Sequence, residues 1–189
     1  MLPILVTSNA KKRREIRLAL GMKVRAASLN LPEIQSTDES AVAIDKAKRA
    51  YRLTKQPVIV EDIGLHLSCL NGFPGALIKQ LIEAAGVEGV PAIASKLKNR
   101  RAWAGIAVVF HDGRTTKVFK KKVYGTIAIA PHKNPTYSFG WNTVFVPRGS
   151  TKTLAEMPMS ALVVRGEVYS KLKRWLLKNN SCCRPSNVF

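Results

Sequence analysis

The spacing of apolar residues divides the first half of the chain into short strands and longer helices. Short apolar runs between turn residues are typical of buried strands, whereas apolar residues at helical spacing are typical of a helix with one buried face. Asn9 and Thr37 are placed to cap two such helices, and Gly21 is placed to end the first. The pattern predicts strands at 2–6, 24–27 and 58–60, and helices at 10–20, 38–53, 76–86 and 87–97.

The pattern becomes extended in the second half of the chain. Residues 103–110 and 116–129 have the composition of extended strands, with imperfect alternation in the second segment, and the turn His111-Asp112-Gly113 between them predicts a long β-hairpin. A strand at 143–146 and an amphipathic helix at 167–178 complete the predicted elements.

The order of these elements predicts one body of the α/β or α+β class with a cleft. The chain has no internal repeat and no linker that would divide it, and its 189 residues suit a single hydrophobic core. We therefore assign residues 1–178 to one domain. Residues 179–189 are polar and contain Pro185, and we expect them to form a disordered tail.

The composition indicates a soluble globular protein with a polyanionic partner. Hydrophobic residues make up 46% of the chain and charged residues 23%, and no apolar run is long enough to span a membrane. Its three cysteines form no disulfide framework, and the N-terminus lacks a signal-peptide pattern, so we expect a cytoplasmic protein. The net charge of +19 indicates a nucleoside triphosphate, a nucleic acid or an acidic surface as partner.

Two adjacent carboxylates, Glu61 and Asp62, follow the apolar run 58–60, and we expect them where this strand gives way to a loop. The chain has only 12 acidic residues against 31 basic ones, so solubility does not explain an acidic pair beside a buried strand. Mg²⁺ prefers carboxylate oxygens and retains several waters. The pair is therefore a candidate metal seat. The alternative, in which the charges simply meet water at a strand end, stays open on these residues alone.

A second candidate site is the turn Thr7-Ser8-Asn9, between the first strand and the first helix. Such a turn presents backbone N–H groups and the positive end of a helix dipole to an anion. Four basic residues, 11–14, occupy the first helical turn, where the dipole disfavours them. A phosphate ligand explains their presence, and a basic helix face without a ligand is the alternative.

The return strand of the predicted hairpin is rich in lysine. We interpret its lysines as an exposed edge of the sheet, and RNA contact through this basic surface is the alternative. The residues are Lys117, Lys120, Lys121 and Lys122.

The histidines give no metal site, because they are scattered along the chain. We interpret His66, His111 and His132 as surface residues or as core residues with satisfied ring nitrogens. Trp103 lies in an apolar periodic stretch, and we expect it in the core.

A loop acid, Glu33, and an aromatic pair, Phe139 and Trp141, complete what a nucleotide site needs: phosphate donors, a metal seat and a stacking surface for a base. In these features and their order the sequence resembles the inosine triphosphate pyrophosphatases, which hydrolyse non-canonical purine nucleoside triphosphates. The resemblance covers about residues 2–177 and rests on seven motifs. They are T-x-N-x-x-K-x-x-E at 7–15, L-x-E-x-Q at 31–35, K-A and A-Y within 46–51, V-E-D-x-G-L with L-x-G-x-P-G at 60–75, F-G-W at 139–141, T-x-A-E-M at 153–157 and R-G at 165–166.

The resemblance implies an elongated, two-lobed α/β fold of the inosine-triphosphatase kind. In this fold a long mixed β-sheet is flanked by helices, and the nucleotide occupies a central cleft. It also implies a homodimer. The implied reaction is Mg²⁺-dependent hydrolysis of ITP, dITP or XTP between the α and β phosphates, which yields a monophosphate and pyrophosphate.

The resemblance also assigns roles to individual residues. Asp62 is expected to orient or deprotonate the attacking water, with Lys12 and Glu61 as further catalytic groups. The expected metal ligands are Glu33, Glu61 and Asp62. The expected substrate-binding residues, which hold the phosphates, stack on the base or bond its exocyclic oxygen, are Thr7, Asn9, Lys12, Lys79, Phe139, Trp141, Asn142 and Arg165.

Part of the family's pattern is altered in this chain. Asn142 stands where the family has aspartate, and Ile63 stands where it has a small residue. The K-N…S-H-R segment that closes over the base is shortened: Arg165 is retained, but Val163 and Val164 replace the Ser-His pair. An apolar site discriminates poorly between a keto and an amino group. We therefore expect weakened or altered base selectivity.

Two other functions remain open. One is a nucleotide- or RNA-binding protein on the same fold without useful turnover. The net charge of +19 and the shortened segment before Arg165 favour this alternative. The other is a pyrophosphatase of relaxed or shifted specificity. Glu33, Glu61, Asp62 and Lys12 favour an enzyme, because a binding protein would be free to lose them.

Overall fold

Two long antiparallel strands, β3 (Val58–Leu67) and β5 (Arg101–His111), form the spine of the protein. The structure is a computed structural model that describes residues 2–132 and 140–179 of the chain. In these residues the strands make a seven-stranded mixed sheet in the order β2-β1-β3-β5-β6-β7, with β4 also paired to β3. The other strands are β1 (Ile4–Val6), β2 (Ala26–Ala27), β4 (Pro74–Gly75), β6 (Thr116–Ile127) and β7 (Phe145–Pro147).

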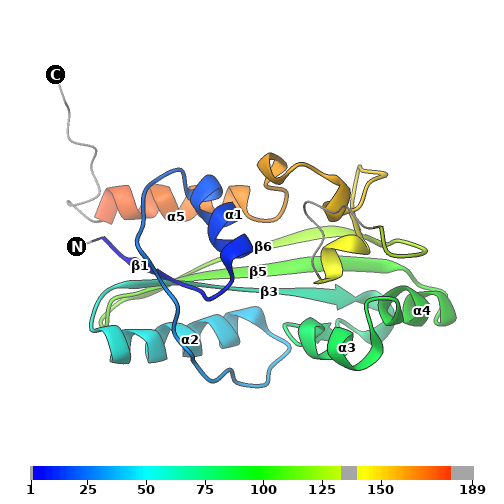
Figure 1. Cartoon of the computed structure of the whole chain (residues 1–189), viewed down its shortest axis with the longest axis horizontal. Helices are drawn as coiled ribbons and strands as arrows, with labels where there is room; N and C mark the ends of the chain where they lie inside the picture. The colour runs from blue at the N-terminus through cyan, green and yellow to red at the C-terminus, as the bar shows by residue number, and fades with distance from the viewer. Residues whose placement is uncertain (1, 133–139, 180–189) are drawn as a thin grey trace.

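Helices cover both faces of this sheet, as Figure 1 shows. The helices α1 (Ala10–Leu20) and α5 (Gly166–Asn179) lie on one face, and α2 (Glu39–Thr54) lies on the other. Two short helices, α3 (Ile78–Ala85) and α4 (Gly89–Lys96), lie beside one end of the long strands. Four short 3₁₀ turns, η1 to η4, span Ser68–Leu70, Gly140–Thr143, Leu154–Glu156 and Met159–Ala161.

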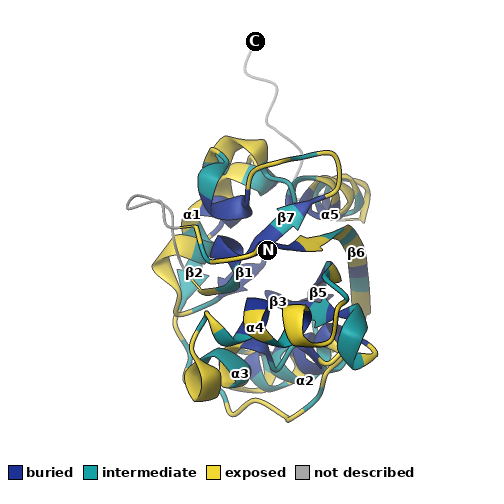
Figure 2. Cartoon of the chain, turned by 90° about the vertical axis from the view of Figure 1, so that its right-hand side faces the viewer, coloured by how far each residue is buried: buried dark blue, intermediate teal, exposed yellow. Residues whose placement is uncertain are grey.

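The core follows from the alternation of side chains along β3, because successive residues of a strand point to opposite faces. Ile59 and Leu65 belong to the larger hydrophobic cluster, which includes the buried residues of α1 and α5. Val58 and Val60 belong to a smaller cluster with the alanines of α2. The end-on view in Figure 2 shows the buried strands between the two layers of helices.

The expected α/β class, the long mixed sheet and the elongated shape are confirmed by this arrangement. The strands form a spine because β3 pairs with β5 over all ten of its residues. The predicted hairpin is also present, with β5 and β6 in register from Arg101 opposite Thr126 to His111 opposite Thr116. The domain boundary at residue 178 stays a prediction, and positions 180–189 of the predicted tail lie outside the described residues.

Helix caps decide where the first two helices begin. The side chain of Asn9 accepts hydrogen bonds from the backbone N–H groups of Lys11 and Lys12, as a predicted N-cap should. Gly21 ends α1 with a φ of 59°, in the left-handed region. The predicted cap of α2 was wrong by one residue, because Asp38 rather than Thr37 accepts the hydrogen bond from Ser40 N.

The expectation that the strand ends at the carboxylate pair is also wrong. Glu61 and Asp62 lie inside β3, which continues to Leu67 because β5 remains paired with it. The continuation of β3 beyond Asp62 could not be predicted from the sequence, because a glycine such as Gly64 is typical of a strand end. Here the glycine is needed for space: a Cβ at this position would lie under 3.0 Å from a carboxylate oxygen of Glu39.

The sheet has a gap beside the centre of β3. On that side β1 pairs with residues 58–60 and β4 pairs with residues 65–66. Within the described part of the chain, residues 61–64 pair only with β5. One edge of β3 is therefore open at the two carboxylates.

No helix among the described residues combines the length and the apolar character that a membrane span requires.

We expect Leu172→Ala to lower the free energy of unfolding by roughly 2 to 5 kcal/mol, because truncating a buried leucine leaves a cavity. Leu172 is fully buried where α5 packs on the sheet. The matched control is Leu53→Ala, since Leu53 is 66% exposed on α2, and surface changes usually stay within about 0.5 kcal/mol. Urea unfolding measures both, and equal losses would contradict this account of the core.

Candidate active site

A cavity of about 630 Å³ opens at the gap in the sheet. The turn 7–9 and Lys12 line one side of it, and the loop 29–33 and Lys46 line another. The open edge of β3, the start of α3 and the segment 154–165 complete the wall. The cavity therefore brings together residues from both ends of the chain.

Glu61 points to the face of the sheet that carries α1 and α5. Nε and Nη2 of Arg165 donate to its two carboxylate oxygens at 2.8 and 2.7 Å, and the hydroxyl of Tyr169 donates at 3.1 Å. Nζ of Lys12 lies 3.8 Å away. Nη1 of Arg165 donates to Glu15. Glu61 is thus the centre of a buried charge network.

The charges in this network decide which carboxylate ionises readily. Burial raises the pKa of Glu61, but the Arg165 guanidinium, Lys12 and the hydrogen bond from Tyr169 outweigh burial and hold this pKa below its usual value. Burial dominates at Glu15 and raises its pKa despite the pairing with Arg165. Burial and the Glu61 carboxylate raise the pKa of Tyr169. Glu61 is therefore a fixed anion rather than a group that exchanges protons near neutral pH.

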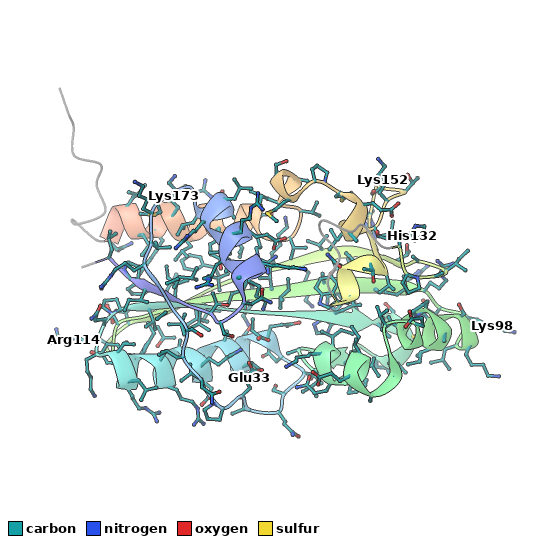
Figure 3. All side chains as sticks on the ribbon, in the orientation of Figure 1. Glu33, Lys98, Arg114, His132, Lys152 and Lys173 are labelled. Atoms are coloured by element: carbon teal, nitrogen blue, oxygen red, sulfur yellow. The ribbon has the colours of Figure 1, made fainter. Side chains whose placement is uncertain are left out.

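Asp62 points to the opposite face, toward α2. Nζ of Lys46 lies 3.4 Å from Oδ1 of Asp62 and 2.7 Å from a carboxylate oxygen of Glu33. Glu33 lies in a loop on the α2 side of the sheet, as Figure 3 shows. Burial raises the pKa of Asp62 to about 6, against the opposing charges of Lys12 and Lys46. A carboxylate with such a pKa is suited to accept a proton near neutral pH.

The predicted set of three metal ligands is divided between the two faces. In the described residues no three His, Cys, Asp or Glu side chains lie close enough together to hold a metal ion. Glu61 is directed to Arg165, whereas Glu33 and Asp62 converge on one cation, the ammonium of Lys46. The strand's alternation explains the separation, because Glu61 and Asp62 are neighbours on one strand. Two converging carboxylates fit Mg²⁺, which often uses one or two protein carboxylates together with waters and substrate phosphates.

The predicted phosphate residues Thr7, Asn9 and Lys12 line the cavity together. The side-chain oxygen of Asn9 caps α1, so its amide nitrogen is the group of this side chain that could donate to a ligand. Lys79 also borders the cavity, but its side chain is 79% exposed and lies 3.6 Å from Glu83. The structure thus places Lys79 at the mouth and the other three at the wall.

The predicted base-binding residues are only partly brought together. Trp141 and Asn142 line the cavity, and Trp141 packs edge-on against Phe145 with ring centroids 5.9 Å apart. Phe139 lies outside the described residues. Arg165 is 7% exposed, and its side-chain nitrogens donate to the carboxylates of Glu61 and Glu15. The predicted bond from Arg165 to a base stays a prediction, and the structure gives this side chain other partners.

The rest of this end of the cavity is apolar. The segment between η3 and α5 contributes Met157, Met159, Leu162, Val163 and Val164 to its wall. Val163 and Val164 are the residues that replace the polar pair of the resembled family.

Three residues of the site were missed as functional groups by sequence reasoning. Lys46 was noted only as part of a motif, although it bridges Glu33 and Asp62. Glu15 and Tyr169 complete the network around Glu61. A signal existed for Glu15, which is the one acidic residue of α1 and directly precedes the buried Ile16. Tyr169 looks like an ordinary core aromatic in the sequence.

Comparisons with known proteins show which family the chain resembles. A model of the Ham1 family matches residues 3–175. A dITP/XTP pyrophosphatase of Hyperthermus butylicus is 34% identical over 179 residues, which cover 92% of this chain and 93% of the relative. An inosine triphosphate pyrophosphatase of Yarrowia lipolytica is 35% identical over 181 residues, which cover 92% and 94%. A solved HAM1 protein from Coxiella burnetii, 22% identical, has the same fold with a TM-score of 0.80 and covers 94% of this chain and 100% of its own.

Asp62→Asn should change how stability depends on pH. The pKa of Asp62 rises from 3.8 to about 6 on folding. Below about pH 4, Asp62 is protonated in both the folded and the unfolded state, so the shifted pKa does not affect stability. Above about pH 6 it is ionised in both states, and the full cost of ionising it in the buried site lowers the free energy of unfolding. Relative to the variant, the wild-type protein should lose up to about 3 kcal/mol of stability across this window. Urea unfolding of both proteins from pH 4 to 7.5 measures the difference.

A sign control accompanies this measurement. Hydrogen bonds from Lys171 and Lys121 lower the pKa of Glu167. The wild-type protein should therefore gain stability relative to Glu167→Gln as the pH rises, the opposite direction. A pH-independent difference between wild type and Asp62→Asn would contradict the buried, proton-accepting carboxylate.

Proposed function

The chain belongs to the Ham1 family, and we infer that it hydrolyses non-canonical purine nucleoside triphosphates such as ITP, dITP and XTP. Relatives named dITP/XTP pyrophosphatase and inosine triphosphate pyrophosphatase match it over more than nine tenths of both chains, which supports this activity. The observation that carries the inference is the cavity at the gap in β3. It has a helix N-terminus and Lys12 on one wall and Asp62 with Lys46 and Glu33 on another.

The phosphates are held at the start of α1 in this proposal. The backbone N–H groups of the turn 7–9 and the dipole of α1 favour an anion there. Lys12 adds a positive charge, and the fixed anion Glu61, 3.8 Å from its Nζ, holds that charge in place. Lys79 at the mouth offers a further cation to the outer phosphate.

Glu33 and Asp62 are the residues that would hold Mg²⁺. Bound there, the ion would offset phosphate charge and make water a better nucleophile. Lys46 has a related role through its own charge, because it already orients both carboxylates toward one point. Glu61 pairs with Lys12 and Arg165 and holds them in place, so we do not include it with Glu33 and Asp62 as a metal ligand.

Asp62 is the proposed group that orients the attacking water and accepts its proton. With a pKa of about 6 it is mostly ionised at pH 7.5 and still basic enough to take a proton. Attack at the α phosphorus would release pyrophosphate and leave the monophosphate. The base is held by Trp141, Asn142 and Phe139 in this proposal.

A homodimer and a cytoplasmic location are further parts of the proposal that rest on the family resemblance and on the sequence. RNA contact through the lysines of β6 also stays a prediction. It draws support from exposed side chains at Lys117, Lys120 and Lys122, and from an outer edge of β6 that pairs, among the described residues, only at 125–127.

A second candidate is a pyrophosphatase of relaxed base selectivity. The observation in its favour is the apolar wall of residues 157–164, together with the commitment of Arg165 to Glu61 and Glu15. Among the described residues of 154–164 that line the cavity, no side chain carries a donor for a keto oxygen. Such a site pays no penalty of an unpaired polar group when it binds an amino base.

Pyrophosphate release from ITP with Mg²⁺ tests the proposed reaction. Asp62→Asn should reduce kcat by roughly 100- to 10,000-fold, because it removes the proton acceptor. The matched control is Asp45→Asn on α2, since among the described residues Asp45 pairs only with Arg49, one helical turn away, and does not line the cavity. Release of orthophosphate instead of pyrophosphate, or full activity of Asp62→Asn, would contradict the proposal.

Base selectivity is tested by comparing kcat/KM for ITP, XTP, dUTP, GTP and ATP. An apolar wall should give a ratio of ITP to ATP below about 100, whereas a site that hydrogen-bonds the 6-keto group, which ATP lacks, reaches about 10,000 or more. A ratio in the higher range would contradict relaxed base selectivity.

A further inference from the structure

The carboxylate of Glu39 and the imidazole of His66 are in contact beside the turn 68–75, which leads into α3. Glu39 is the first residue of α2 and is only 8% exposed, and its carboxylate contacts Nε2 of His66 on β3. The other ring nitrogen, Nδ1, lies 2.8 Å from the carbonyl oxygen of Gly72. The ring of His66 therefore faces an oxygen at each of its nitrogens.

These contacts fix the number of protons on the pair. A carbonyl and an ionised carboxylate only accept hydrogen bonds, and a neutral imidazole has one N–H to donate. Either both nitrogens of His66 carry a proton, or Glu39 carries one and donates it to Nε2. In both cases the pair holds one proton more than a neutral histidine beside a carboxylate. Without that proton, one of the two contacts of His66 is lost.

The backbone around the pair provides the space that it fills. Gly64 of β3 and Gly105 of β5 lie opposite each other, and a Cβ on either would come within 3.0 Å of the Glu39 carboxylate. A Cβ on Gly75 would lie 2.9 Å from Cε1 of His66. Three glycines thus make the space that the carboxylate and the ring fill.

An indole covers one face of the His66 ring. His66 stacks on Trp103, with ring centroids 4.8 Å apart and planes 7° from parallel. The described charged groups that face this cluster are Glu39 from α2 and Lys122 from β6. Nζ of Lys122 lies 5.3 Å from the Trp103 ring centroid, so its charge is directed to the indole.

The pair joins three elements beside the nucleotide cavity. His66 belongs to β3, Glu39 begins α2, and Gly72 lies in the turn 68–75 between β3 and α3. The backbone N–H of Ala76 donates to the carbonyl of Thr37 at 3.1 Å, which ties the end of this turn to the segment before α2. Ala76 and the first residues of α3 line the cavity. The position of the turn therefore sets one wall of the cavity.

We propose that His66 and Glu39 form a proton-dependent latch that holds the turn 68–75 and the start of α3 in the position that binds nucleotide. When the pair loses its extra proton, the turn is released and nucleotide affinity falls. Both are positioning residues, since neither lines the cavity. The link to nucleotide affinity rests on the proposed function, and the latch itself does not.

The latch is tested without nucleotide by NMR on the full chain. At pH 7 a free histidine is mainly neutral, whereas the His66–Glu39 pair should show two hydrogen-bonded protons at the ring nitrogens. Amide exchange at Gly72 and Ala76, corrected for its intrinsic pH dependence, should lose about tenfold of its protection between pH 6 and 9. In Glu39→Gln this loss should vanish, because a glutamine amide donates to a neutral Nε2.

The control is His111→Gln. His111 is another buried histidine, but it contacts Thr116 and Tyr51 at the far end of β5. This variant should keep the pH dependence of exchange at Gly72 and Ala76. A single neutral tautomer of His66 at pH 7 in the wild type, or the same pH dependence in Glu39→Gln, would overturn the latch.

The coupling to substrate is read from the Michaelis constant. The KM for ITP of the wild type should rise about fivefold from pH 6 to 9 relative to Glu39→Gln, while the ratio of their kcat values stays constant. Equal KM profiles would overturn the coupling. Absence of turnover in every protein, with protonated His66 and pH-dependent exchange intact, would sink the proposed function and leave the latch standing.

Discussion

The site depends on one missing strand pairing. β1 leaves β3 after residue 60, and β4 joins it only at residue 65, so the edge of β3 between them faces a cavity. A strand in this position can present neighbouring side chains from both of its faces to the same space. Glu61 and Asp62 use this possibility: one carboxylate meets the helices α1 and α5, and the other meets α2. A continuous sheet would bury both carboxylates or separate them completely.

The division between faces also divides the work of the charges. Glu61 receives two hydrogen bonds from Arg165 and one from Tyr169, which fixes it as an anion. Arg165 stands 104 positions further along the chain, so the same contact fastens the C-terminal helix to the central strand. Asp62 has only Lys46 as a hydrogen-bonding partner among the described residues, and burial keeps its pKa near neutral. Glu61 thus accepts three hydrogen bonds, whereas Asp62, the proposed proton acceptor, accepts one among the described residues.

The sequence predicted the fold well because most of its signals are local. The hairpin of β5 and β6, the cap at Asn9 and the stop at Gly21 follow from periodicity and turn chemistry. The length of β3 could not be predicted in this way, because Gly64 resembles the end of a strand in the sequence. The glycine is needed there because the Glu39 carboxylate, which belongs to another element, lies against it. The family motifs named most of the charged residues that line the cavity, but they could not show that Arg165 is committed to Glu61 and Glu15. Such partners are 104 and 150 positions away, and only the packed structure brings them together.

The two ends of the cavity differ in the interactions that they offer, and this difference affects how base recognition can change in such a site. The end near α1 and β3 is charged: its helix N-terminus, lysines and two converging carboxylates suit phosphate groups and a metal ion. In the proposed function, these are features that all nucleoside triphosphates share. At the other end, residues 157–164 offer apolar contact, which responds to shape rather than to the pattern of donors and acceptors. No described hydrogen bond links Met157, Met159, Leu162 or Val164 to Asp62, Lys46 or Glu33 by their side chains. Changes in base recognition can therefore accumulate at the second end while the charged end keeps its chemistry.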